Sequence, residues 1–123
     1  MPVKRLSPKA LEQLLDGRTR EAATCVVKFY SNTCDMCHNL KEYYETLSED
    51  QDYSDLYFFA FNIADRASVQ EELQFKGTPT IALLQVPSTP QKPRIRVMPD
   101  PEEPNQQTWY KIKDIRNFIE KEK

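Results

Sequence analysis

Two cysteines separated by only two residues are the part of this sequence best suited to chemistry, in the run Cys34-Asp35-Met36-Cys37. Side chains three positions apart on a helix are neighbours, so two such sulfurs lie close enough to form a disulfide. A cysteine in the first turn of a helix meets free backbone N–H groups and the positive end of the helix dipole, which favour the reactive thiolate. The spacing therefore predicts redox or metal chemistry.

The surrounding residues predict different roles for the two sulfurs. Residues 31–33 are all candidate helix caps, and with Thr33 as the N-cap a helix starts at Cys34 and runs to about Glu49. Cys37 then lies on one helical stripe with three core-type residues, namely Leu40, Tyr44 and Leu47. We expect Cys34 to be the exposed attacking cysteine and Cys37 to be the sheltered resolving one.

Metal binding is disfavoured by the remaining ligand types. Cys37 and His38 are adjacent, so on a helix their side chains point about 100° apart. Structural zinc takes four ligands in tetrahedral geometry, and the sequence has no second cysteine pair. Cys25 lies within an apolar run and is expected to be an inert core thiol. We therefore expect redox chemistry with no metal at the site.

The composition bounds the class of protein. The 123 residues are one domain's worth, so residues 1–123 are expected to form a single domain. The 17 basic and 19 acidic residues give a formal net charge of −2, which offers no electrostatic footprint for nucleic acid or an anionic membrane. No apolar run approaches the roughly 20 residues that span a bilayer, and no secretory signal is evident. We expect a cytoplasmic monomer.

Hydrophobic patterns and turn residues predict an α/β domain. Ser7 and Pro8 begin a helix that Gly17 ends. A strand, a long helix and a second strand then form a βαβ unit with parallel strands and a right-handed crossover. The predicted strands are 23–30, 56–63, 80–86 and 94–98, and the predicted helices are 8–15, 33 or 34 to 49, 68–75 and 111–120. The proline-rich segments 87–93 and 99–105 are expected to be irregular.

Two motifs resemble the thioredoxin family. The first runs from Val26 to Cys37 (VVKFYSNTCDMC), and the second, from Phe75 to Thr80 (FKGTPT), leads into a later predicted strand. The resemblance covers roughly Ser7 to the C-terminus. It implies the thioredoxin fold, an α/β architecture in which a central mixed sheet of four or five strands is flanked by about four helices.

The resemblance also implies how a client protein is held. It implies a cis Thr78–Pro79 peptide bond beside the cysteine pair. In the family, the backbone of the residue before this proline pairs with an extended client segment, which is a form of strand addition. Thr78 and Pro79 are therefore expected to bind substrate, and we expect Thr33 and Met36 to contact it as well.

A two-step exchange is the implied reaction. The Cys34 thiolate attacks a partner disulfide, and Cys37 then attacks Cys34, which releases the reduced partner and leaves a Cys34–Cys37 disulfide. This redox-active disulfide carries the chemistry, so no cofactor is expected. The implied partners are protein disulfide clients and an electron donor that resembles thioredoxin reductase. The expected activity is that of a protein disulfide reductase.

The motif between the cysteines departs from the family. Thr33 stands where a tryptophan is usual, and Asp35-Met36 replaces the usual Gly-Pro. A carboxylate beside Cys34 disfavours its thiolate and partly opposes the helix dipole. We therefore expect Asp35 to modulate the site and to make it reducing rather than oxidising.

Lys28 and His38 are further departures, and both are expected to modulate the site. Thioredoxins usually carry a buried aspartate at the position of Lys28, which helps to deprotonate the resolving cysteine. Lys28 could stabilise a thiolate as a cation, or act as a base if burial lowers its pKa. Alternatively, its amine reaches solvent or pairs with a nearby carboxylate. His38 is either a group that titrates near neutral pH or an exposed residue of the first turn.

Two other interpretations remain open. The departures leave open a thioredoxin-fold binding subunit with weak or no redox turnover, in which the fold serves a larger assembly, as the alternative to the reductase. A glutaredoxin is the nearer enzymatic competitor, but the chain lacks the Gly-Gly motif for glutathione because Gly17 and Gly77 are its only glycines.

Overall fold

A five-stranded mixed sheet forms the centre of the protein, in the order β1-β3-β2-β4-β5. The structure is a computed structural model that describes residues 3–19, 21–88 and 91–123. The strands β1, β3 and β2 are parallel, whereas β4 and β5 run antiparallel to them. The strand bounds are β1 Val3–Arg5, β2 Ala23–Tyr30, β3 Tyr57–Asn62, β4 Thr80–Val86 and β5 Arg94–Val97.

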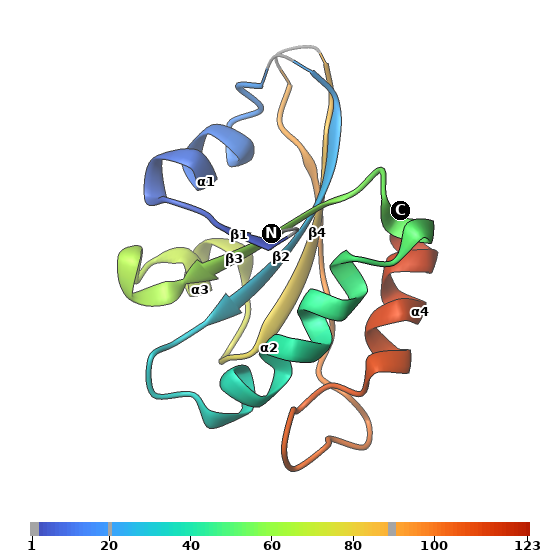
Figure 1. Ribbon diagram of the computed structural model, residues 1–123. Helices are drawn as coiled ribbons and strands as arrows, with labels where there is room; N and C mark the ends of the chain where they lie inside the picture. The colour runs from blue at the N-terminus through green and yellow to red at the C-terminus, as the bar shows by residue number, and fades with distance from the viewer. Residues whose placement is uncertain (1–2, 20, 89–90) are drawn as a thin grey trace.

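Helices cover both faces of this sheet (Figure 1). One face carries α1 and α3, and the other carries α2 and α4, so the chain has the three layers of an α/β domain. The helix bounds are α1 Pro8–Leu15, α2 Asp35–Ser48, α3 Val69–Leu73 and α4 Ile112–Glu122. Two short 3₁₀ turns, Gln51–Tyr53 and Ile63–Asp65, flank β3.

The central strand β2 separates two hydrophobic clusters. Alternate side chains of a strand point to opposite faces, and Val27 packs with the core under α1 and α3 while Val26 packs with the core under α2 and α4. Each cluster is buried against its helices, so β2 is covered on both sides. Lys28 follows the same alternation as Val26 and therefore lies on the α2 face.

Most predicted elements are confirmed, and the α/β class with a mixed sheet and four helices is the observed architecture. The strands 23–30 and 80–86 and the helix 8–15 have the predicted bounds, and the other predicted elements differ by one or two residues at their ends. Segment 99–105 is irregular as predicted. The predicted loop 87–93 includes Thr89 and Pro90, which lie outside the described residues.

The first strand, β1, was not predicted from the sequence. Its three residues pair in parallel with β3, so that Val3 lies opposite Phe58 at the edge of the sheet. Two of the three side chains are exposed, which leaves no alternating apolar pattern to recognise. The strand matters because Arg5 reaches the cavity described below.

The ends of α1 follow the local sequence rules. Ser7 has extended backbone and its hydroxyl accepts the backbone N–H of Ala10 at 3.1 Å, which satisfies a free donor at the helix start. Gly17 ends the helix with φ +70°, a conformation that suits glycine and strains other residues. A Cβ placed there would overlap the carbonyl oxygen of Gln91.

We predict that Gly17→Ala lowers the free energy of unfolding by about 1–3 kcal/mol, because alanine both strains the left-handed backbone and collides with the segment at Gln91. Urea unfolding monitored by circular dichroism measures the change. Gly77→Ala is the matched control, since Gly77 has no positive φ and a Cβ there meets nothing within 4 Å. Equal effects of the two substitutions would contradict this explanation.

Candidate active site

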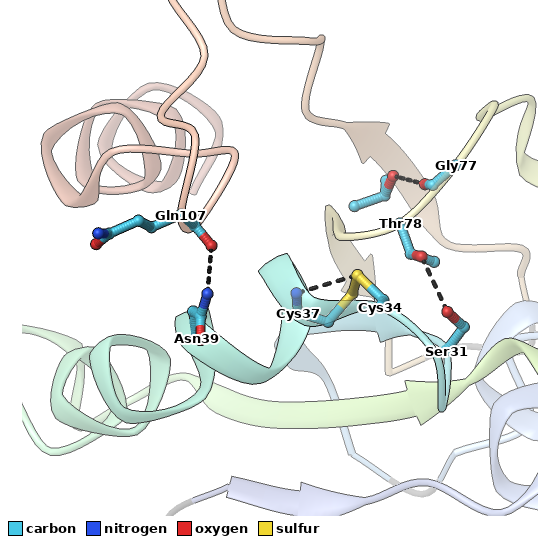
Figure 2. Close-up of a disulfide and its surroundings, with 8 residues drawn as sticks. Ser31, Cys34, Cys37, Asn39, Gly77, Thr78 and Gln107 are labelled. Carbon is cyan, nitrogen blue, oxygen red and sulfur yellow. Dashed lines mark hydrogen bonds between the residues drawn. A yellow bond between two sulfur atoms is a disulfide. The ribbon is translucent and has the colours of Figure 1, made fainter.

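The site begins where the chain passes from β2 to α2. Cys34 is the N-cap of α2, with extended backbone (φ −92°, ψ 102°), and its Sγ accepts the backbone N–H of Cys37 at 3.0 Å (Figure 2). The expectation that Thr33 caps this helix is therefore wrong. The N–H of Cys34 donates to the carbonyl of Ser31 at 3.3 Å and forms a turn. Because of this turn, the helix begins one residue later than predicted. Thr33 is exposed on this turn.

Cys34 and Cys37 are joined by a disulfide, with their Cα atoms 5.3 Å apart. This separation lies within the range of about 4.4–6.8 Å that disulfides require. Cys34 is half-buried, whereas Cys37 is only 3% exposed and faces the core with Leu40 and Tyr44. Cys34 is therefore more accessible to a partner molecule than Cys37, as the helical pattern predicts.

The second motif lies beside the disulfide, as Figure 2 shows. The Thr78–Pro79 peptide bond is cis, and the hydroxyls of Thr78 and Ser31 are 3.4 Å apart, which links this loop to the turn before Cys34. The hydroxyl of Thr80 donates to the carbonyl of Gly77 at 2.6 Å and closes the loop on itself. Residues far apart in the sequence thus meet at one end of the sheet.

The other residues of the cysteine motif lie around the disulfide at the start of α2. Asp35 is exposed in the first turn, where a carboxylate faces the positive end of the helix dipole. Met36 is half-buried, and His38 is exposed at the edge of a cavity that Cys34 and Cys37 also line. The structure therefore brings all the predicted motif residues to one end of the molecule.

Lys28 is buried, at 5% exposure, on the strand beneath α2. The alternative that its amine pairs with a carboxylate is wrong: among the described residues, no carboxylate oxygen lies within 4.0 Å of it. The amine has no hydrogen-bond partner but is not among the fully buried polar atoms, so it keeps some contact with solvent through the cavity that it lines. The amine lies 5.2 Å from the ring centroid of Tyr44 and 5.9 Å from that of Tyr30. Burial lowers the pKa of Lys28 to about 8, although the Glu45 carboxylate partly offsets this.

The cavity beside the disulfide contains groups that the sequence did not single out. Its volume is about 450 Å³, and its lining includes Arg5 from β1, Ala60 from β3, and Lys41 and Glu45 from α2. Lys41 and Glu45 follow Cys37 at intervals of four, which is the spacing of one helix face, so their position beside Cys37 was accessible to sequence reasoning. The position of Arg5 could not be predicted from the sequence, because β1 has no recognisable pattern.

Tyr44 connects α2 to the sheet beneath the site. It is fully buried, and its hydroxyl donates toward the carbonyl oxygens of Val26 at 2.9 Å and Phe59 at 2.7 Å, one on β2 and one on β3. Burial raises the pKa of this phenol well above its ordinary value, so it stays protonated and keeps donating. This contact holds the helix that carries the cysteines against the strand that carries Lys28.

The segment between β5 and α4 also approaches the cysteine helix, which sequence reasoning did not find. The side-chain amide of Asn39 donates to the carbonyl of Gln107 at 2.9 Å, as Figure 2 shows. Asn105 and Trp109 form an isolated antiparallel bridge, and Trp109 has a positive φ of 67°. Loops carry no periodic pattern, so neither contact has a sequence signal beyond the polar residue types.

The third cysteine takes no part in this arrangement. Cys25 is 1% exposed in the core under α1 and α3, and burial raises the pKa of its thiol to about 11. Within the described part of the chain, no three His, Cys, Asp or Glu side chains group in a way that could hold a metal ion. No helix among the described residues is long and apolar enough to cross a membrane.

Comparisons with known proteins agree with the geometry. Residues 3–100 match the family model for thioredoxin. No curated protein sequence matches the chain. Solved structures share the fold at low identity: thioredoxin from Malassezia sympodialis is 15% identical with a TM-score of 0.67, covering 98% of this chain and 93% of that one. Poplar thioredoxin h is 18% identical with a TM-score of 0.67, covering 98% and 96%.

Two further structures extend this comparison. The Trx4 domain of ERdj5 has a TM-score of 0.72 at 16% identity, covering 98% of this chain and 95% of that one. A chain from the complex of ferredoxin:thioredoxin reductase with thioredoxin f2 has a TM-score of 0.68 at 17% identity, covering 98% and 94%. The family match, the shared fold and the disulfide at the start of α2 lead to one conclusion: the chain belongs to the thioredoxin family of thiol–disulfide oxidoreductases.

Proposed function

We propose that this chain is a protein disulfide reductase that cycles between a Cys34/Cys37 dithiol and the Cys34–Cys37 disulfide. The observation that carries the proposal is the unequal exposure of two bonded cysteines at the start of a helix, with Cys34 half-buried and Cys37 3% exposed. One sulfur is open to a partner disulfide, and the other is placed to attack only a sulfur already bonded to Cys34.

In the first step, the Cys34 thiolate attacks a client disulfide and forms a mixed disulfide, while the client's other sulfur leaves as a thiolate. The hydrogen bond from the Cys37 backbone N–H at 3.0 Å supports this role, because a donor aimed at the sulfur stabilises its negative charge. In the second step, Cys37 attacks Cys34, the client leaves as a dithiol, and the intramolecular disulfide re-forms.

The client is proposed to lie along the loop that contains the cis proline. Thr78 is half-buried beside the disulfide, and the contact between Thr78 and Ser31 holds this loop against the turn that carries Cys34. An extended client segment beside Thr78 and Pro79 would place its sulfur over Cys34. The exposed Thr33 and the half-buried Met36 flank that path and are proposed to contact the client.

Regeneration of the dithiol requires an electron donor, and we propose a reductase of the thioredoxin-reductase type. Support comes from the shared fold with a chain of the complex between ferredoxin:thioredoxin reductase and thioredoxin f2. The Asp35 carboxylate beside Cys34 disfavours its thiolate and supports a reducing potential, well below the roughly −120 mV of strong protein oxidants.

We predict that Cys34→Ser lowers the rate of insulin reduction with dithiothreitol at least a hundredfold, because no sulfur remains to attack the client. Cys37→Ser is expected to lose multiple turnover as well but to accumulate a mixed disulfide between Cys34 and the client, detected by intact-protein mass spectrometry. Cys25→Ala is the matched control and should retain turnover, since Cys25 is buried in the core away from the disulfide.

Absence of insulin reduction by the parent protein would contradict the reductase proposal. If clients from a lysate bound equally well to the Cys34→Ser/Cys37→Ser double variant, the chain would instead act as a binding subunit of thioredoxin fold. A Cys37→Ser variant that trapped no mixed disulfide, while the parent turned over, would contradict the assignment of Cys34 as the attacking residue.

A further inference from the structure

Lys28 is a buried cation for which the two-step exchange alone gives no role. Its side chain is 5% exposed, and within the described residues its amine makes no hydrogen bond or ion pair. The amine lies 5.2 Å from the ring centroid of Tyr44 and 5.9 Å from that of Tyr30, and these aromatic faces partly offset its loss of hydration. A lysine is seldom buried without a partner, because desolvation of the ammonium opposes folding.

The Lys28 amine faces the cavity beside the disulfide. Lys28, Cys34 and Cys37 all line this cavity of about 450 Å³. Its volume accommodates several water molecules, each of which occupies about 30 Å³ in the liquid. Lys28 is paired in the sheet with Ala60, whose small side chain leaves the space above the neighbouring strand open. An amine and a resolving thiol therefore share one polar space that can hold bridging water.

The resolving step needs a proton acceptor in this space. Cys37 must lose its proton before it can attack, since the thiolate is the nucleophile. Cys37 is only 3% exposed, and burial disfavours a lone thiolate. A neighbouring amine that takes the proton forms an ammonium beside the thiolate, so the net charge of the cavity does not change.

The other titratable groups that face the cavity are less suited to this task. Arg5 on β1 is bonded to Asp65 at 2.9 Å. On α2, the Tyr44 hydroxyl donates to backbone carbonyls, and its raised pKa keeps it protonated. His38 and Lys41 on α2 are exposed to solvent. Tyr30 on β2 offers its ring face to Lys28.

Among the described residues, Glu45 on α2 is the one carboxylate that lines the cavity, and it is half-buried. Its charge favours the ammonium form of Lys28 and so assists proton uptake by the amine. Glu45 is also the competing proton acceptor, which the experiment below must separate from Lys28.

We propose that Lys28 accepts the proton of Cys37, through water in the shared cavity, when Cys37 resolves the mixed disulfide. This inference rests on the proposed reductase function. The reactants are the Cys34–client disulfide, the Cys37 thiol and the neutral Lys28 amine. The Cys37–Cys34 sulfur bond forms, the Cys34–client sulfur bond breaks, and the products are the intramolecular disulfide, a client thiolate and the Lys28 ammonium.

The protonation behaviour of Lys28 fits this cycle. Burial lowers its pKa to about 8, so the neutral amine is accessible near neutral pH, as it would not be at the ordinary value of 10.5. The ammonium later returns its proton to solvent through the cavity, and the site is ready for another turn. General acid–base participation of this kind typically accelerates a step by about 10²–10⁴-fold.

A single-turnover experiment with 5,5′-dithiobis(2-nitrobenzoate) separates the two steps, since attack by Cys34 and resolution by Cys37 each release one coloured thiolate. In Lys28→Met we expect the first release to change less than about threefold and the second to slow at least tenfold at pH 7. The pH midpoint of the second release should also rise. An unchanged rate and midpoint for the second release would overturn the proposal.

Three further variants separate the possible causes. Lys41→Met removes a charge from the exposed edge of the same cavity, where Lys41 contributes only the smallest of the effects on the pKa of Lys28, so it should change the second release far less than Lys28→Met does. Glu45→Gln should slow it only modestly, and a loss as large as that of Lys28→Met would assign proton transfer to Glu45 instead. Lys28→Arg keeps the charge but releases no proton in this range, so full rescue would overturn proton transfer. A parent protein that releases only one thiolate would contradict the reductase function itself.

The burial of Lys28 has an independent test in stability. The lysine is charged up to about pH 10.5 in the unfolded chain but only up to about pH 8 in the folded protein, so burial of the ammonium destabilises the fold below pH 8. Stability contributed by Lys28 therefore rises with pH from 8 to 10.5. We expect oxidised Lys28→Met to unfold at a temperature higher by about 5 °C at pH 7, with a smaller difference at pH 10. No difference at either pH would overturn the burial on which the proposal depends.

Discussion

The hydrogen bond from the Cys37 backbone to the Cys34 sulfur sets where α2 begins, and the rest of the site depends on that position. Because Cys34 is the N-cap, Cys37 falls within the first turn and faces the core, while Cys34 stays at the N-terminal start of the helix. The helix is in turn held to the sheet by Tyr44, whose hydroxyl reaches carbonyls on two adjacent strands. The difference between the two sulfurs is therefore a property of how the helix is capped and docked.

Burial of Lys28 lowers the stability of the fold beside the candidate active site. The Lys28 ammonium has no ion-pair partner in the described part of the chain, so its burial opposes folding, and an apolar residue at this position would pack against Tyr44 without that penalty. Conflicts between a residue and its environment are expected where function requires them. Here the conflict faces the same cavity as the disulfide, whereas the third cysteine sits in an ordinary apolar core on the other side of the sheet.

Sequence reasoning was most accurate where a pattern reflects burial directly. The strands at 23–30 and 80–86 are long, apolar and covered on both faces, so their bounds were predicted as observed. The strand β1 was missed because it has only three residues, two of them exposed. The cap of α2 was misplaced by one residue because Thr33 and Cys34 can both accept a backbone N–H, and only the turn at Ser31 decides between them.

The burial of Lys28 also lay beyond the sequence pattern. Period-two alternation gives the face of the sheet on which Lys28 lies, but the path of a long side chain depends on its neighbours from β3 and α2, here Ala60 and Tyr44. The contact between Asn39 and Gln107 was missed for a related reason, since it joins a helix to a loop that has no periodicity.

The proposed mechanism requires Cys34 to be the accessible nucleophile and Cys37 the sheltered one. The most direct measurement is the rate of alkylation of each cysteine in the fully reduced protein, with iodoacetamide at pH 7 and peptide mass spectrometry to assign the modified residue. We expect Cys34 to be alkylated at least tenfold faster than Cys37, because of the two cysteines Cys34 is the one open to solvent at the helix start. Equal rates, or faster alkylation of Cys37, would contradict it.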